Sequence, residues 1–236
     1  MVTGEGGMRP VGRAWRRFFD ERAVAGNPHH VRVGYSSAAN ARAMKELVRR
    51  LMGAPGGRLV LDAGCGDGVL ASGLVGADRV VGVDFTPGML ALARGQGLLP
   101  VRADIGALPF ADGSFDLVAC VETVTVTDDP LATVAELARV VAPGGRLIVT
   151  ALNRRSPLRR AVRGVLARLG HLQPALLGAD AVARTLADAG LTVEETVWVA
   201  LDAAWREPAA GRRGALSRLR ERMAPNFAVV ARRPAV

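Results

Sequence analysis

The fold is decided by the stretch Val60-Leu61-Asp62-Ala63-Gly64-Cys65-Gly66-Asp67-Gly68, in which an apolar run leads into a glycine-rich loop. Glycines at alternate positions let the backbone turn sharply and let a ligand approach the main chain. Twenty residues after Gly64, Asp84 ends a second apolar run, Val80–Val83. A carboxylate there can accept both hydroxyls of a ribose. This pair predicts a nucleoside held at the C-terminal edge of a parallel sheet, and the alternative is a tight turn with a helix-capping aspartate.

The spacing of the glycines restricts the kind of nucleoside. A dinucleotide-binding loop needs glycine at its first, third and sixth positions, and counting from Gly64 the sixth position is Val69. Asp62 opens the loop with a negative charge, which disfavours a pyrophosphate and suits a ligand with a cationic head. The sequence contains no Gly-x-x-x-x-Gly-Lys-Ser/Thr motif, so a P-loop is excluded.

Outward from the loop, short apolar runs alternate with helical patterns, which is typical of βαβ units and a parallel sheet. The expected strands are Leu59–Leu61, Val80–Val83, Leu98–Val101, Phe115–Val121 and Arg146–Thr150, and the helices between them are Val69–Val75, Pro87–Arg94 and Pro130–Val141. Before the loop, apolar residues at helical spacing predict helices at Val11–Ala25 and Ala38–Met52. After the fifth strand we expect helices at Pro157–Leu169, Ala179–Ala189 and Gly214–Met223, and an edge pair of strands at Leu191–Val199 and Phe227–Ala231.

Length and composition limit the class of protein. The 236 residues, half of them apolar, fit one large α/β domain that folds without a covalent staple. Cys65 and Cys120 are the only cysteines, so a disulfide scaffold and a zinc cluster are excluded and no metal site is expected. No run of eighteen apolar residues occurs and the Gly-rich N-terminus lacks a signal-peptide core. We therefore expect a cytoplasmic protein.

The net charge of +9 is unevenly spread. Residues 1–58 carry 11 basic and 4 acidic side chains, residues 59–150 carry 5 and 11, and residues 151–236 carry 15 and 7. The basic flanks either meet an anion, such as a lipid surface, a nucleic acid or an acidic substrate, or are ordinary solvated surface.

Five segments of the sequence, taken in order, resemble the class I S-adenosylmethionine-dependent methyltransferases of the type 11, ubiquinone/menaquinone-methyltransferase-like kind. The matching segments are Asp62–Gly68, Asp84, Arg102–Ile105, Leu108–Asp116 and Glu136–Gly145. The resemblance implies an α/β, Rossmann-like, doubly wound seven-stranded mixed sheet of order 3-2-1-4-5-7-6, with the last strand antiparallel and helices on both faces. It also implies a single domain over 1–236, with an N-terminal helical lid (1–58), a cofactor-binding core (59–150), a substrate-side insertion (151–178) and a C-terminal helix with strands six and seven (179–236).

The same resemblance implies S-adenosylmethionine as the cofactor, with S-adenosylhomocysteine as its product. The expected cofactor-binding residues are Tyr35, Asp62, Ala63, Gly64, Cys65, Gly66, Asp84, Phe85, Met89, Ala103, Asp104, Ile105, Cys120 and Glu122. The loop would carry the methionine moiety, Asp84 the ribose, and Phe85, Met89, Asp104 and Ile105 the adenine. Phe85 and Met89 also fit plain core packing, and Asp104 also fits a turn cap.

The catalytic residues are not defined by the sequence. Many relatives carry a histidine just after the fourth strand, whereas Val121–Pro130 contains none. The remaining histidines, His29, His30 and His171, are candidates beside the alternative that they are ordinary surface residues. Methyl transfer needs a general base only if the acceptor still holds its proton, so the absence of a histidine there does not argue against catalysis.

The expected acceptor is a small molecule, and three alternatives remain. A nucleic-acid methyltransferase is disfavoured because no Asn/Asp-Pro-Pro-Tyr/Phe signature follows the fourth strand. A lipid or quinone methyltransferase at the membrane surface would use Pro157–Leu169 as a basic amphipathic helix in peripheral membrane contact, although the same helix also fits a cover over an apolar pocket. A binding protein without turnover is the third alternative. The expected assembly is a monomer or a homodimer.

Overall fold

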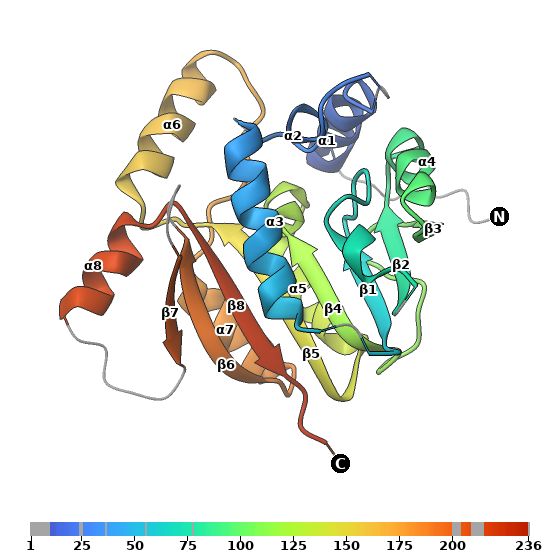
Figure 1. The fold of residues 1–236 in the computed structure, drawn as a ribbon. Coiled ribbons are helices and arrows are strands. Elements are labelled where there is room, and N and C mark those ends of the chain that lie inside the picture. The colour runs from blue at the N-terminus through green and yellow to red at the C-terminus, as the bar shows by residue number, and fades with distance from the viewer. Residues whose placement is uncertain are drawn as a thin grey trace.

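A mixed sheet of eight strands runs through the centre of the computed structural model, which describes residues 10–23, 26–35, 37–54, 56–76, 78–199, 204–208 and 215–235 (Figure 1). The strands lie in the order β3-β2-β1-β4-β5-β8-β6-β7. Their bounds are β1 Leu59–Ala63, β2 Arg79–Asp84, β3 Leu99–Arg102, β4 Phe115–Val121, β5 Val141–Leu152, β6 Thr192–Val199, β7 Ala204–Pro208 and β8 Asn226–Arg232.

The strands divide into a parallel half and an antiparallel edge. Strands β3, β2, β1, β4 and β5 are all parallel, whereas β8 pairs antiparallel with both β5 and β6. The predicted order 3-2-1-4-5-7-6 with an antiparallel last strand is confirmed, with β8 as the seventh predicted strand. The structure adds β7, which pairs antiparallel with β6 at the edge and which the sequence pattern did not predict.

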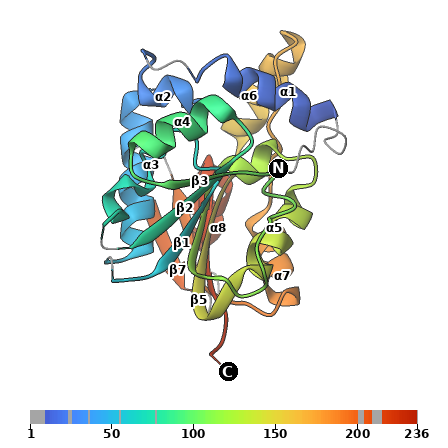
Figure 2. The ribbon, with the colours of Figure 1, turned by 90° about the vertical axis from the view of Figure 1, so that its right-hand side faces the viewer.

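Helices cover both faces of the sheet (Figure 2). Their bounds are α1 Pro10–Asp20, α2 His29–Arg32, α3 Ala38–Met52, α4 Pro87–Gly95, α5 Pro130–Arg139, α6 Pro157–Arg168, α7 Ala179–Asp188 and α8 Ala215–Met223, with short 3-10 helices η1 Ala71–Leu74 and η2 Thr123–Val126. Apolar residues of α3, η1 and α4 pack into the core on one face, and those of α5 and α7 pack on the other. Residues 24, 25 and 214 of the predicted helices lie outside the described residues.

The helix predicted at Val69–Val75 is wrong in kind, because the chain forms only the 3-10 turn η1 there. Gly68 has a φ of +75°, and a Cβ on it would lie 2.8 Å from the Cα of Ala93, so the loop packs directly against α4. The Ser72 hydroxyl also donates to the Val69 carbonyl at 3.0 Å, which competes with continued helical bonding. The glycine loop is therefore followed by a tight turn rather than by a full helix.

The C-terminal end of α3 is tied to the body of the protein. The guanidinium of Arg58 donates to the carbonyl of Met52 at 2.8 Å, and that of Arg146 donates to the carbonyl of Leu51 at 3.0 Å. Arg146 also pairs with Glu194 of β6 at 3.1 Å. At the other end of α3, the Ser37 hydroxyl accepts from the Asn40 amide. These bonds fix α3 across the sheet, with its first turn beside the carboxyl ends of the strands.

Among the described residues, no helix is long and apolar enough to cross a membrane.

Candidate functional site

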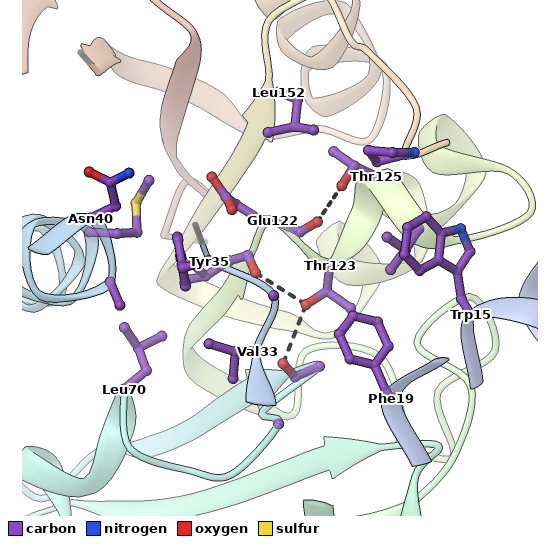
Figure 3. Close-up of a pocket in the computed structure, with 18 of the residues that line it drawn as sticks. Trp15, Phe19, Val33, Tyr35, Asn40, Leu70, Glu122, Thr123, Thr125 and Leu152 are labelled. Atoms are coloured by element: carbon purple, nitrogen blue, oxygen red, sulfur yellow. Dashed lines mark hydrogen bonds between the residues drawn. The ribbon is translucent and has the colours of Figure 1, made fainter. Parts of the chain in front are cut away.

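A cavity of about 460 Å³ lies at the carboxyl ends of β1, β2 and β4 (Figure 3). The N-terminal helices form one wall, and α6 with the loop that follows it contributes to the other. The structure brings eleven of the sequence-predicted residues to this cavity: His29, Tyr35, Asp62, Gly64, Cys65, Gly66, Asp84, Phe85, Met89, Glu122 and His171. Segments far apart in the chain thus meet at the edge of the sheet where the glycine loop predicted a site.

The glycine loop fits tightly against η2. Gly64 has a φ of +76°, and a Cβ on it would lie 2.3 Å from the side chain of Thr123. The Thr123 hydroxyl donates to the Gly64 carbonyl at 3.3 Å, a bond drawn in Figure 3. The amides of Gly64 and Cys65 both donate to the carbonyl of Val83, at 2.7 and 2.9 Å. Only glycine meets both the steric and the conformational requirement at position 64.

Asp62 is a buried carboxylate without a partner on one oxygen. Its side chain is 1% exposed, and within the described chain its Oδ2 atom forms no hydrogen bond. Burial, together with the nearby charges of Asp84 and Asp67, raises its pKa to about 7. Because an unpaired buried carboxylate is costly, this side of the cavity suits a cationic ligand group.

Asp84 sits at the end of β2 with both oxygens hydrogen bonded to the backbone. Its Oδ2 accepts from the Gly66 amide at 3.0 Å and its Oδ1 accepts from the Thr86 amide at 2.8 Å. Burial raises its pKa, and these backbone hydrogen bonds oppose that effect. Asp84 therefore shapes the glycine loop in addition to facing the cavity, a role that the sequence pattern did not indicate.

Asp67 connects the loop to the N-terminal helices. Its carboxylate is 1% exposed. Arg32 Nη2 donates to Oδ2 at 2.7 Å, and His29 Nδ1 lies 2.9 Å from the same oxygen. Burial alone would raise the pKa of Asp67, but the hydrogen bonds from His29 and Arg32 outweigh burial and lower it. His29 is thus engaged in a structural contact, and His30 does not line the cavity.

A second polar group at the cavity is formed by Glu122, Asn226 and Arg159. Glu122 follows β4, and its Oε1 accepts a hydrogen bond from Nδ2 of Asn226 on β8. Asn226 Oδ1 in turn accepts from Arg159 Nε of α6 at 3.2 Å. Burial raises the pKa of Glu122 and Arg159 opposes it. Burial also raises the pKa of Tyr35, whose neighbours in this electrostatic group are Glu122 and Arg159.

Some predicted site residues do not line the cavity. These are Ala63, Ala103, Asp104, Ile105, Cys120 and His30. Asp104 is exposed and its Oδ1 accepts from the Gly106 amide at 2.8 Å. Cys120 is completely buried, and burial raises the pKa of its thiol to about 12. The predicted cofactor roles of the first five residues and the role of His30 as a catalytic candidate stay predictions.

Several residues at the site were missed by sequence reasoning. Trp15, Phe18 and Phe19 line the cavity as a cluster of rings, in which Trp15 stacks on Phe19 and Phe18 meets both edge to face. Their helical spacing was visible in the sequence. Asp67 lies within the quoted loop, but its partners are 35 and 38 residues away. Asn226 has no sequence signal at all, because its bond to Glu122 spans 104 residues.

The sequence matches a known family over the core of the sheet. Residues 61–149 match the model of a methyltransferase domain. A ubiquinone biosynthesis O-methyltransferase of Bordetella avium is 36% identical over 118 residues, covering 46% of this chain and 48% of the relative. A protein of the same name from Methylococcus capsulatus is 37% identical over 107 residues, covering 42% of this chain and 45% of the relative. The chain spans about half the length of the curated relatives it matches.

The fold is shared with solved structures over almost the whole chain. A methyltransferase from Thermotoga maritima has a TM-score of 0.67 at 20% identity, covering 94% of this chain and 99% of that one. The geranyl diphosphate C-methyltransferase of Streptomyces coelicolor has a TM-score of 0.66 at 17% identity, covering 95% and 98%. Residues 61–149 therefore match a methyltransferase domain, and they lie in the Rossmann-like sheet described above.

Proposed function

We propose that this protein transfers a methyl group from S-adenosylmethionine to a small-molecule acceptor. The observation that carries the proposal is the buried Asp62 carboxylate with its unpartnered oxygen, which lines the same cavity as the glycine loop. S-adenosylmethionine is a nucleoside with a positively charged sulfur and an amino group, so it supplies the cationic head and the ribose that Asp62 and Asp84 suit. The family match over residues 61–149 supports the same ligand.

In this proposal, different residues of the site bind different parts of S-adenosylmethionine. The backbone of Ala63–Gly66 holds the methionine moiety, Asp84 accepts the ribose hydroxyls, and Phe85 and Met89 flank the adenine. The predicted contacts of Asp104 and Ile105 with the edge of the adenine stay predictions, because Asp104 is exposed, Ile105 is buried and neither lines the cavity. Among the described residues, no group of three or more side chains could hold a metal ion.

The bound methyl group is already activated by its positive sulfur, so the protein mainly has to position the acceptor. Holding two reactants in line can supply roughly 7–11 kcal/mol of the barrier. The Asp67 contacts with His29 and Arg32 hold α2 against the loop. The aromatic residues of α1 lie along the same wall, and together these groups exclude water from the reacting atoms.

The apolar residues in the cavity lining favour an apolar acceptor. Its lining includes Val126, Leu152, Leu166, Leu172 and Val199. A pocket of mostly apolar side chains with few polar groups selects a hydrophobic or aromatic small molecule. The names of the relatives, ubiquinone biosynthesis O-methyltransferases, are in keeping with a phenolic hydroxyl as the accepting group.

Calorimetric titration tests the proposal directly. We expect S-adenosylmethionine and S-adenosylhomocysteine to bind and NAD to leave no heat signal. Asp84→Asn, which keeps the volume but removes the charge, should weaken binding of S-adenosylhomocysteine at least tenfold. The control Asp188→Asn changes an exposed aspartate of α7 and should leave the affinity unchanged. Absence of binding by the wild type to either sulfur nucleoside would refute the proposed function.

A membrane-bound variant of this function is favoured by a second observation. Helix α6 has no buried residue, and Leu158, Val165 and Leu169 are 51%, 54% and 66% exposed. Leu219 and Met223 of the adjoining α8 are also exposed, at 56% and 57%. Exposed arginines on the same helices, Arg160, Arg163, Arg168, Arg218 and Arg222, complete a basic apolar surface that fits an anionic lipid surface.

Co-sedimentation with vesicles separates this variant from a reaction in solution. We expect binding to vesicles of phosphatidylglycerol and phosphatidylcholine, with weaker binding in high salt because screening reduces charge attraction. Val165→Glu with Leu169→Glu should abolish it. The control Leu99→Glu changes a leucine of β3 that is 49% exposed and should leave binding unchanged. Equal sedimentation of both variants, or none by the wild type, would leave methyl transfer in solution as the function.

A further inference from the structure

We propose that Glu122 is the general base of this site, taking the proton from a hydroxyl group of the methyl acceptor. This inference rests on the proposed function, since it assigns a role within methyl transfer. The Glu122 side chain lines the cavity together with Tyr35 and Leu152 (Figure 3). It was expected from the family resemblance to contact the cofactor, and its surroundings favour a role toward the acceptor instead.

The backbone at Glu122 is held in an unusual conformation. Its φ is +59°, and among the described residues no other non-glycine residue has a positive φ. This left-handed region costs a non-glycine residue roughly 1–2 kcal/mol. Two threonines clamp the conformation: Thr150 Oγ1 accepts from the Glu122 amide at 2.9 Å, and the Thr125 hydroxyl donates to the Glu122 carbonyl at 2.5 Å. Such strain persists where surrounding contacts over-determine it, which is common at active sites.

The clamp turns the chain out of the direction of β4 and leaves the Glu122 carboxylate at the cavity. One oxygen, Oε1, accepts from Asn226 Nδ2. Arg159 fixes the orientation of the Asn226 amide because Asn226 Oδ1 accepts from the Arg159 guanidinium. Within the described residues the other oxygen, Oε2, accepts no hydrogen bond and is the atom that can accept the proton. Asn226 and Arg159 are therefore positioning residues that act through Glu122.

The histidines do not compete for this role. His29 is engaged by Asp67, and His30 does not line the cavity. His171 lines it but is itself exposed, with its backbone amide donating to the Leu166 carbonyl. Glu122 instead has a fixed backbone, one carboxylate oxygen held by Asn226 and a second oxygen without a partner among the described residues. Its side chain lines the same cavity as the glycine loop and the apolar residues.

The charged and titratable groups around Glu122 affect its strength as a base. Tyr35 lies near it from the segment after α2 and Arg159 from α6, and His171 of the loop after α6 lines the same cavity. Burial raises the pKa of Glu122 above its ordinary range, and Arg159 limits the rise. A carboxylate whose pKa is raised toward the working pH is a more effective base.

The step balances without any further reactant. The O–H bond of the acceptor breaks and its proton passes to Glu122 Oε2. A lone pair on the acceptor oxygen forms the new bond to the methyl carbon, and the carbon–sulfur bond breaks with its electron pair left on the sulfur. The products are a methyl ether, neutral S-adenosylhomocysteine and protonated Glu122, which returns its proton to water.

The test compares Glu122→Gln with the wild type on four phenols of increasing acidity: phenol, catechol, 4-cyanophenol and 4-nitrophenol. General base catalysis contributes about 10²–10⁴-fold. We expect Glu122→Gln to lose at least 100-fold in kcat on phenol and catechol, and under tenfold on 4-nitrophenol, which is largely ionised at pH 8. The wild-type rate should fall at low pH along a limb that Glu122→Gln lacks. Glu122→Asp, which keeps a carboxylate on a shorter arm, should recover part of the lost rate.

Calorimetry with S-adenosylhomocysteine and thermal unfolding keep the outcomes distinct. Glu122→Gln should bind S-adenosylhomocysteine with an affinity within threefold of the wild type and should have the same melting temperature. The control Glu46→Gln, which changes an exposed residue of α3, should give the same two results. An equal loss of rate on all four phenols, or a loss of product binding, would show a structural or cofactor role and overturn the proposal. Product binding without methylation of any phenol by the wild type would also overturn it, while leaving the proposed function standing. Failure of the wild type to bind the product would instead refute the proposed function.

Discussion

His29 Nδ1 lies 2.9 Å from Asp67 Oδ2, which joins the N-terminal helices to the glycine loop across 38 positions of the chain. Arg32 reaches the same carboxylate at 2.7 Å. The loop expected to hold the cofactor is therefore bonded to the segment that covers it. A shift of α2 should therefore change the conformation of the glycine loop, and a change in the loop should shift α2.

Loss of the contact to Asp67 should loosen the cover. We expect His29→Ala with Arg32→Ala to weaken S-adenosylhomocysteine binding about tenfold, since hydrogen bonds to a charged partner contribute about 1.5–3 kcal/mol. Amide hydrogen exchange should accelerate in α1 and α2 and stay unchanged in α5. His30→Ala, one position from His29 and outside the cavity wall, serves as the control. Unchanged exchange in the double variant would contradict the link between cover and loop.

The Asp67 contact also predicts acid sensitivity. Because the folded-state pKa of Asp67 is lowered, the carboxylate stabilises the fold above its unfolded pKa of about 3.9, and this contribution is lost as the pH falls through the folded pKa. Asp67→Asn should therefore lower the free energy of unfolding at pH 7, and the gap to the wild type should close as the pH falls below about 4. Urea unfolding across this range measures it. A gap that widens toward low pH would refute the assignment.

Asp62 predicts the opposite dependence. Its folded pKa of about 7 lies above the unfolded value of about 3.9, so the folded state holds a proton that the unfolded state has lost. The ligand-free protein should thus lose stability as the pH rises from about 4 through about 7. Asp62→Asn should remove this loss and melt higher than the wild type at pH 8, while binding S-adenosylmethionine more weakly.

The same carboxyl predicts proton release on binding. A cationic ligand favours the charged form of Asp62, so at pH 7 binding of S-adenosylmethionine should release about half a proton. Titrations in phosphate and in Tris, whose ionisation enthalpies differ, measure the released fraction. Asp62→Asn should release none, and identical heats in the two buffers for the wild type would count against the raised pKa.

Gly64 and Gly164 form a matched pair for testing the fit of the loop. A Cβ at Gly64 would lie 2.3 Å from the Thr123 side chain, whereas a Cβ at Gly164 in α6 would meet nothing within 4 Å. Gly64→Ala should destabilise the fold by about 1–3 kcal/mol through overpacking and abolish product binding. Gly164→Ala should stabilise it by about 0.5–1 kcal/mol, as expected for glycine in a helix interior. Chemical denaturation of both variants provides the comparison.

Much of the fold follows from local sequence signals. The alternation of buried strands and helices defined the parallel half of the sheet, and β4 and α3 begin and end where the pattern predicts. Two elements, η1 and β7, were not predicted. The glycines and Ser72 shortened the helix after the loop to η1, and β7 pairs only with the outer edge of β6, so it carries no buried-strand signal.

The site was predictable where its chemistry is local. Asp62, Gly64, Gly66 and Asp84 reach the cavity because the loop and the end of β2 are neighbours in a parallel sheet. The Glu122–Asn226–Arg159 group was not predictable as a group. Its members come from β4, β8 and α6 and meet only once the antiparallel edge strand is in place.

The bonds from Arg58 and Arg146 to the last turn of α3 bear on how ligands exchange. Helix α3 is bonded at one end and packed along the sheet by Met44, Val48 and Leu51. It is therefore not free to move away from the cavity. We therefore expect α1 and α2 to move when ligands exchange. Helix α2 is held to the glycine loop by the contacts of His29 and Arg32 with Asp67. Entry and exit of ligands should therefore depend on whether His29 and Arg32 release the Asp67 carboxylate.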